Sequence, residues 1–293
     1  MNRSRLQIAK PDIKAFFNVQ PSRVLKYREI GRLLSEQRAG WRLAQSTTID
    51  EFVRFLSKDG ALKRLAFDFP HRPETLYVWG QVPLLEALLS LKDKSYFSHY
   101  TAMHWHGLTE QIPKTLYISH ERSAEVEPGE LDQAAIDEAF KRPPRISKNT
   151  ADLEGRRIVL INSAFTGERG VVRQEVQQGS EDAASVRLTN IERTLIDAAV
   201  RPFYSGGVSE VAKAFELAKG RVSANAMAAM LKQLGYAYPY HQAIGYYMER
   251  AGYKQTQLDL LQRLPRPFDF YLTHEMVETV YVEAWRLYVP KGF

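Results

Sequence analysis

Apolar residues recur with a helical period over residues 49–56, just before a stretch that has the character of two strands. They share one face of a 3.6-residue period and predict an amphipathic helix: Ile49, Phe52, Val53 and Leu56. Thr48 and Glu51 form a capping box, in which hydroxyl and carboxylate satisfy amide donors of the first turn. Gly60 marks the expected end of this helix.

Residues 62–68 and 74–79 are runs rich in large apolar residues, joined by a segment that holds two prolines. This pattern predicts a two-stranded hairpin. A helix followed directly by a hairpin is typical of the recognition helix and wing of a winged helix. The alternative is an ordinary helix and hairpin with a solvated charged face.

The preceding segment predicts two more helices. Residues 13–20 are amphipathic and end at Pro21, and residues 27–37 have an apolar face opposite Arg28 and Arg32. Those two arginines are more often a solvated face than a phosphate clamp. The expected order is helix, helix, helix, hairpin.

Beyond Gly80 the pattern predicts a larger mixed domain. Expected helices cover residues 84–89, 132–141, 208–219, 224–234 and 241–250, with strands over 115–119, 268–272 and 287–289. Residues 158–164 and 171–176 predict paired strands, with a third over 183–188, and Thr189 and Glu192 form a second capping box ahead of another helix. We therefore expect an α+β protein, with an N-terminal winged helix-turn-helix over residues 1–80 and a larger mixed α/β domain over 81–293.

Charge is distributed unevenly between these two parts. Residues 1–80 hold 15 Lys and Arg against 8 Asp and Glu, a net of +7, whereas the remaining 213 residues hold 25 against 26. The basic excess therefore belongs to the N-terminal part, and it predicts a polyanionic partner there.

Composition narrows the cellular setting. The chain has no cysteine, which excludes disulfides and thiol chemistry and fits a reducing interior. No apolar run approaches the ~18 residues of a membrane span, and residues 1–10 lack the apolar core of a secretion signal. We expect a cytoplasmic protein without a membrane partner.

Double-stranded DNA is the expected partner of the N-terminal part. The candidate contacts lie on the helix, the turn before it and the hairpin: Arg42, Thr47, Thr48, Arg54, Lys58, Lys63, Arg64 and Arg72. Asp50 and Glu51 depart from this pattern, since carboxylates repel phosphates. The capping box accounts for Glu51, and the positive end of the helix dipole accounts for Asp50.

Three histidines in the string YFSHYTAMHWHGLT, residues 96–109, raise the question of a metal site. On a helix His99 and His106 share a face, but His104 points ~140° away, because each residue turns the helix by ~100°. Core or capping roles are therefore favoured, and no metal is expected.

The usual catalytic motifs are missing from the sequence. There is no G-x-x-x-x-G-K-[ST] loop, G-x-S-x-G elbow, H-E-x-x-H or dinucleotide glycine triplet. Glu192 and Asp197 are candidates for paired carboxylates, but five residues apart on a helix they point to different sides. We expect no enzymatic activity and no cofactor; an uncharacterised activity is the alternative.

Several strings together resemble the AbiEi family of antitoxins and transcriptional regulators. They are residues 96–109, 111–115 (QIPKT), 192–197 (ERTLID), 201–208 and 238–245 (YPYHQAIG). The resemblance implies a winged helix that represses the protein's own operon and a C-terminal domain that counters a nucleotidyltransferase toxin, as in type IV systems, where the two proteins oppose one another without a stable complex. The alternative is a stand-alone DNA-binding regulator, or an interaction protein without a toxin.

Overall fold

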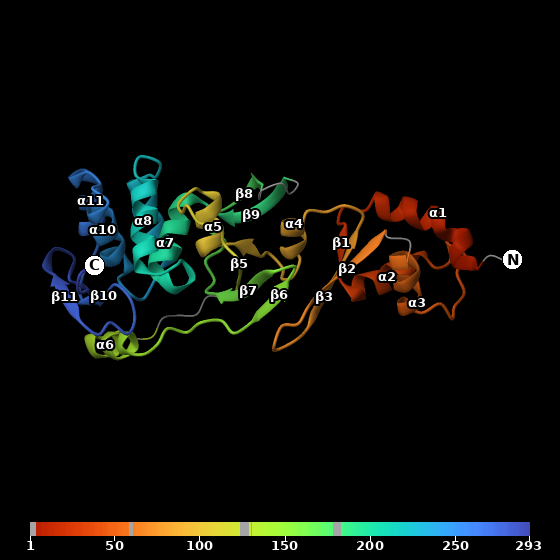
Figure 1. The fold of residues 1–293 in the computed structure, drawn as a ribbon, viewed down its shortest axis with the longest axis horizontal. Helices are drawn as coiled ribbons and strands as arrows, with labels where there is room; N and C mark the ends of the chain where they lie inside the picture. Colours follow the sequence, from red (N-terminus) through yellow and green to blue (C-terminus); the bar gives the residue numbers. More distant parts are fainter. Residues whose placement is uncertain (1–3, 59–60, 124–128, 130, 178–182) are drawn as a thin grey trace. The chain divides into compact units, whose positions relative to one another are not determined.

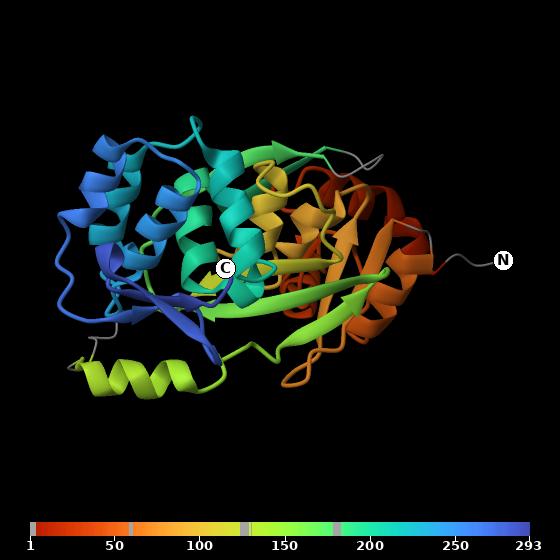
Figure 2. The ribbon, with the colours of Figure 1, turned by 60° about the vertical axis from the view of Figure 1, so that its left-hand side comes forward.

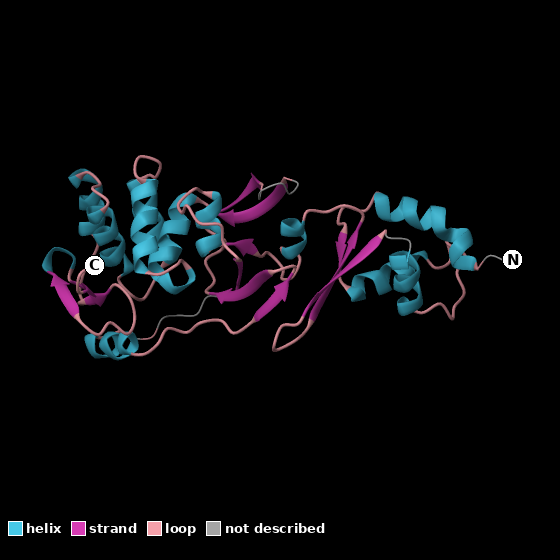
Figure 3. Cartoon of the chain, viewed as in Figure 1, coloured by secondary structure: helices cyan, strands magenta, loops and turns pink. Residues whose placement is uncertain are grey.

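The structure, a computed structural model, describes residues 4–58, 61–123, 129, 131–177 and 183–293. The chain divides into two compact units. The first lies within residues 1–93, 151–154 and 175–185, and the second within 94–150, 155–174 and 186–293. Helices and strands occur in both (Figure 3), so the α+β class expected from the sequence is confirmed. Within the described ranges, no helix combines the length and apolar character needed to cross a bilayer.

The first unit alternates helices with short strands (Figure 1). Its elements are α1 (Arg5–Asn18), β1 (Val24–Leu25), α2 (Tyr27–Gln37), α3 (Ile49–Lys58), β2 (Leu62–Phe67), β3 (Glu74–Trp79) and α4 (Leu84–Leu88). The strands form an antiparallel sheet in the order β1-β3-β2. The predicted bounds of α2 and β3 are those observed, whereas the two-residue β1 was not predicted.

Aromatic side chains form the core of the first unit. The rings of Phe17 and Trp79 stack with centroids 4.8 Å apart, and those of Trp41 and Phe52 stack at 5.6 Å. All four are at least 94% buried. Helices α1 and α3, the turn after α2 and strand β3 are thereby held by contacts that bury large apolar areas.

The first helix begins earlier than the sequence pattern predicted. Helix α1 starts at Arg5 rather than at residue 13, and the Ser4 hydroxyl accepts a hydrogen bond from the amide of Gln7. Pro11 lies inside it, and prolines usually interrupt helices. The buried face nevertheless extends back to Ala9, four residues before Ile13, so packing outweighs the local signal. Gly60, the expected end of α3, lies outside the described residues.

After α4 the chain continues with strands and short helices that belong to the second unit, apart from residues 151–154 and 175–185, which lie in the first. These elements are β4 (Tyr96–Phe97), α5 (His99–Trp105), β5 (Thr115–Glu121), α6 (Gln133–Lys141), β6 (Thr150–Leu153), β7 (Arg156–Ser163), β8 (Val171–Val176) and β9 (Ala184–Thr189). The sheet runs in the order β6-β7-β5-β4-β9-β8. Strands β5 and β7 are parallel, and β4 is antiparallel to β5 but parallel to β9.

The predicted pairing of residues 158–164 with 171–176 is wrong. Strand β7 lies between β6 and β5, and β8 lies beside β9 at the opposite end of the sheet. Alternating apolar positions define a strand and its faces but carry no information about a partner that is distant in sequence. Strands β4 and β6 were not predicted.

The rest of the second unit is mainly helical. Its elements are α7 (Ile191–Val200), α8 (Val208–Ala218), α9 (Ala224–Leu234), α10 (Tyr240–Arg250), α11 (Gln255–Gln262), β10 (Phe270–Tyr271), β11 (Thr279–Val282) and β12 (Leu287–Pro290), with short 3-10 turns at Pro202–Tyr204 and Glu283–Trp285. Figures 1 and 2 show α8, α10 and α11 gathered beside the small sheet β10-β12-β11. Helix α11 and strand β11 were not predicted.

The caps of α9 are those expected from the local sequence, whereas the cap of α7 is determined by tertiary packing. The predicted bounds of α9 are confirmed, with Ser223 as N-cap and Gly235 in the left-handed conformation (φ 59°) at its end. The capping box predicted at Thr189 is wrong. Thr189 is the last, fully buried residue of β9, and the Asn190 side chain caps α7 by accepting from the amide of Arg193.

Candidate nucleic-acid interface

Helix α3 presents the polar face that the sequence predicted. Phe52 and Leu56 are buried on its inner side, whereas Arg54 and Lys58 are exposed on the outer side. The capping box at its start is confirmed: the Glu51 amide donates to the Thr48 hydroxyl (3.2 Å), and the Thr48 amide donates to the Glu51 carboxylate (3.0 Å). A capped helix with two exposed cations on its outer side can lie along a phosphate backbone.

The second carboxylate of this first turn has a partner that sequence reasoning missed. The Tyr27 hydroxyl, at the start of α2, donates a hydrogen bond of 2.8 Å to Asp50 Oδ1. This bond to a carboxylate raises the pKa of the Tyr27 hydroxyl. Asp50 therefore links α2 to α3. A 3.6-residue pattern in either helix carries no sign of this contact.

The turn between α2 and α3 is held by Arg38. Its guanidinium donates to the carbonyl oxygens of Ala44 (2.6 Å) and Thr47 (3.1 Å). Arg42, between buried Trp41 and Leu43, is exposed and has a left-handed backbone (φ 51°). The turn thus has a defined conformation that directs Arg42 outward.

The two candidate threonines differ from the candidate cations. The Thr48 hydroxyl is occupied by the capping box, and Thr47 is only half-exposed. Both also precede the first residue of α3, Ile49, so the predicted stripe from residue 47 to 58 begins in the turn. The helix itself contributes Arg54 and Lys58 to that stripe.

The hairpin separates its two adjacent cations. Lys63 pairs across the sheet with Val78 and Arg64 with Tyr77, and successive residues of a strand point to opposite faces. Arg64 shares its face with Leu62 and Tyr77, which pack in the helix-covered core. Lys63 lies on the other face, where its Nζ is 3.3 Å from Glu154 Oε1.

Arg72 lies in the exposed turn between β2 and β3. The six candidate cations, Arg42, Arg54, Lys58, Lys63, Arg64 and Arg72, are all exposed. They do not all lie on the same side of the first unit. The structure places Arg64 on the sheet face that packs against the helices, and places Lys63 on the opposite face.

His99 and His106 have the core and capping positions that the sequence favoured, whereas His104 is partly exposed within α5. His99 is buried at the start of α5, with Nδ1 2.8 Å from the Ser98 hydroxyl, and the C-cap His106 bonds the Thr189 carbonyl oxygen through Nε2 (2.6 Å). His104 Nδ1 lies 3.2 Å from the Gln111 carbonyl oxygen. Across the residues that the structure describes, no three or more His, Asp or Glu side chains are grouped for metal binding.

Glu192 and Asp197 have separate structural contacts. Glu192 accepts a hydrogen bond from the Ser223 amide (3.0 Å), whereas Asp197 is buried and forms an ion pair with Arg193 (2.8 Å). The structure therefore does not bring them together as a catalytic pair.

Comparison with known proteins gives a likeness of fold. No protein-family model matches the chain, and no curated protein matches it by sequence. One similar solved structure is the RV2827C protein from Mycobacterium tuberculosis, with 12% identity and a TM-score of 0.58 over 98% of this chain and 93% of that one. At this identity the likeness concerns the fold, and it extends through both units.

Proposed function

We propose that the first unit is a winged helix-turn-helix that binds double-stranded DNA. The observation that carries this proposal is the order α1-β1-α2-α3-β2-β3 with sheet order β1-β3-β2, which is the arrangement of winged helices. In helix-turn-helix domains the second helix of the motif enters the major groove. Here that helix is α3, and the β2–β3 hairpin is the wing.

Charge supports the same interpretation. The +7 excess of residues 1–80 includes the exposed Arg54 and Lys58 on α3 and Arg72 at the hairpin turn. The two carboxylates at the start of α3 have hydrogen-bond partners within the unit: Glu51 accepts from the Thr48 amide and Asp50 from the Tyr27 hydroxyl. They are therefore held at the N-terminal end of the helix. Phosphate contacts by such cations position a protein on DNA without reading its sequence.

We further propose that this DNA is the protein's own promoter and that the chain acts as the antitoxin of a nucleotidyltransferase toxin. This part rests on the AbiEi resemblance of residues 96–109, 192–197 and 238–245. Residues 81–293, which are near-neutral in charge, are the part assigned to countering the toxin. A stable complex with the toxin is not required.

The DNA-binding proposal is tested with the full chain and two duplexes of equal length, one from directly upstream of its gene and one shuffled. We expect a gel shift that favours the upstream duplex and weakens steeply as salt rises, because counterions released from phosphates drive binding. Absence of any salt-sensitive shift contradicts DNA binding. Equal binding to both duplexes contradicts promoter recognition.

The antitoxin proposal requires a separate assay. The nucleotidyltransferase gene that adjoins this one is expressed with and without the full chain, from a promoter that the chain does not control. Growth rescued by the chain supports the antitoxin function. Toxicity that persists beside a well-expressed chain favours a stand-alone regulator.

A further inference from the structure

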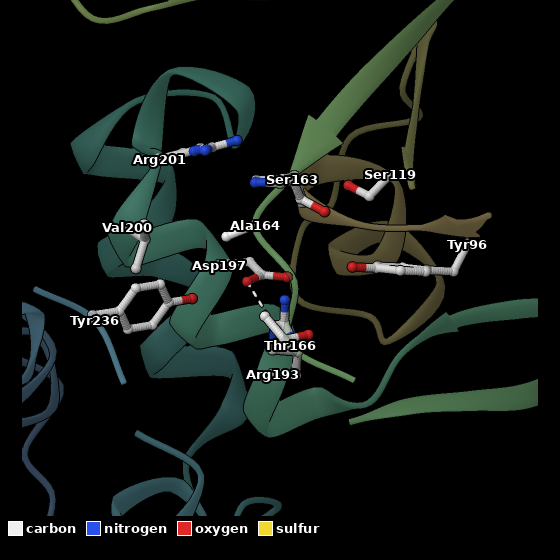
Figure 4. Close-up of a pocket in the computed structure, with 11 residues that line it drawn as sticks. Tyr96, Ser119, Ser163, Ala164, Thr166, Arg193, Asp197, Val200, Arg201 and Tyr236 are labelled. Atoms are coloured by element: carbon white, nitrogen blue, oxygen red, sulfur yellow. Dashed lines mark hydrogen bonds and ion pairs between the residues drawn. The ribbon is translucent and has the colours of Figure 1, made fainter. Parts of the chain in front are cut away.

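The second unit contains a small, partly enclosed cavity at one edge of its main sheet (Figure 4). Ser119 lies near the carboxyl end of β5 and Ser163 ends β7, and these strands are parallel. Tyr96 of the antiparallel β4 pairs with Ser119 and so lies at the same edge. The carboxyl ends of neighbouring parallel strands are where open sheets with helices commonly bind ligands.

One charged pair beside the cavity is already neutralised. Arg193 Nε donates to Asp197 Oδ1 at 2.8 Å, and Arg193 also donates to the Arg169 carbonyl oxygen (2.7 Å) and the Thr166 hydroxyl (3.2 Å). Burial raises the pKa of Asp197, and the charge of Arg193 opposes that rise. The nearby Glu121 is likewise engaged, by the amides of Thr166 and Glu168.

Arg201, the C-cap residue that follows α7, supplies a positive charge without such a partner. It lines the cavity and is half-buried, and within the described part of the chain its guanidinium has no hydrogen bond or ion pair. Figure 4 shows the guanidinium directed toward Ser163 across the cavity. Partly buried cations are normally paired, because loss of hydration is otherwise uncompensated. The charges of the residues that line the cavity, Arg193, Asp197 and Arg201, sum to +1; the Glu121 carboxylate lies next to the lining residue Thr166 but does not itself line the cavity.

The other polar side chains around the cavity are neutral. The hydroxyls of Ser119 and Ser98 lie 2.7 Å apart, and Ser98 continues to His99 Nδ1 at 2.8 Å. Burial, followed by the charges of Arg201 and Arg193, lowers the pKa of His99, so this imidazole is neutral.

In Figure 4 the hydroxyl ends of Tyr96 and Tyr236 point inward from opposite sides. The Tyr96 hydroxyl donates to Glu121 (3.2 Å) and the Ser163 hydroxyl to the His120 carbonyl oxygen (3.2 Å). The Tyr236 hydroxyl has no hydrogen-bond partner among the residues that the structure describes.

The size of the cavity restricts its occupant. Its volume is about 50 Å³, whereas one water needs roughly 10–15 Å³ in the same measure. A nucleoside is too large, but a few waters, or one small oxyanion with a water, fit. An oxyanion satisfies the free guanidinium, since Arg binds carboxylate and phosphate oxygens with parallel N–H donors.

We infer that this cavity is a binding site for a small oxyanion, a phosphate or carboxylate group, held by the guanidinium of Arg201 and by the hydroxyl of Tyr236. Neither the DNA-binding surface nor the antitoxin proposal uses this site.

The test is isothermal titration of the full chain, without DNA, with inorganic phosphate in one arm and acetate in the other, at constant ionic strength in chloride. Wild type is compared with Arg201→Gln and with Arg145→Gln. Arg145 is exposed in the same unit and does not line the cavity, so its variant loses the same charge elsewhere.

We expect saturable 1:1 binding of at least one anion, weakened tenfold or more by Arg201→Gln and unchanged by Arg145→Gln. If phosphate binds and acetate does not, the ligand is a phosphoryl group. If acetate binds and phosphate does not, the ligand is a carboxylate. If Arg201→Gln does not fold, Arg201→Lys keeps the charge without the planar guanidinium and is expected to bind severalfold more weakly.

Two results overturn the inference. One is the absence of saturable binding in both arms, which leaves a water-filled cavity. The other is equal binding by wild type and a folded Arg201 variant. Because no DNA is present, neither result bears on the proposed DNA-binding function.

Discussion

Lys63 and Arg64 are neighbours on strand β2 whose replacement by alanine is expected to have different effects on DNA binding. Both are exposed and each change removes one positive charge. Arg64 shares the sheet face of Leu62 and Tyr77, which pack with the helices, whereas Lys63 lies on the other face beside Glu154. If α3 and the hairpin bind DNA together, Arg64→Ala removes a phosphate contact and Lys63→Ala does not.

The magnitude follows from counterion release. Each phosphate contact contributes about 0.9 to the slope of log affinity against log salt, so its loss at 0.1 M salt weakens binding by about eightfold. Lys63→Ala is expected to leave the slope unchanged, because its amine is directed toward a carboxylate 3.3 Å away. The 3.3 Å pair is more than half exposed, so its loss costs little stability.

The assay is fluorescence anisotropy of a labelled upstream duplex, with the full chain titrated at several salt concentrations between about 0.05 and 0.3 M. Circular dichroism of each variant verifies folding. Equal slopes for both variants, or a larger decrease for Lys63→Ala than for Arg64→Ala, refute the placement of Arg64 on the DNA-facing side of the hairpin and of Lys63 on the other side. If alanine variants of Arg54, Lys58 and Arg72 also leave the salt slope unchanged, α3 and the hairpin are excluded as the DNA-binding surface.

Three further predictions concern stability. Gly245→Ala is expected to lower the free energy of unfolding, measured by chemical denaturation, by about 1–3 kcal/mol or more, because the added Cβ meets three indole atoms of buried Trp285 at 2.1–2.6 Å. The control is Gly40→Ala, whose Cβ has ordinary contacts. Equal effects of the two substitutions contradict the close packing of Gly245 against Trp285. Thr48→Ala is expected to cost about 1 kcal/mol by loss of the cap, with Thr48→Ser close to wild type; an unchanged denaturation midpoint for Thr48→Ala counts against it. Burial lowers the pKa of His241 to about 4, below the unfolded value of about 6.5. The unfolded chain therefore binds more protons in that interval, and stability decreases as pH falls from 6.5 toward 4; His241→Gln should make this decrease shallower, and an unaltered pH profile refutes the assignment.

Local sequence determined the elements whose signals are short-range. The bounds of α2, β3 and α9 follow from apolar period and caps, and the Thr48–Glu51 capping box is present as predicted. These features depend on residues within about one helical turn or on strand alternation, which the sequence displays directly. The uneven charge between the two parts is likewise a property of the sequence itself.

Tertiary structure decided which distant segments meet. Strand β1 exists because residues 24 and 25 pair with β3, and β5 pairs with β7 about 40 residues away in sequence. Asn190 rather than Thr189 caps α7 because Thr189 is committed to β9. The cavity beside Arg201 gathers side chains from residue 96 to residue 236. Such contacts are selected by the burial of apolar area over the whole fold, a quantity that no local pattern contains.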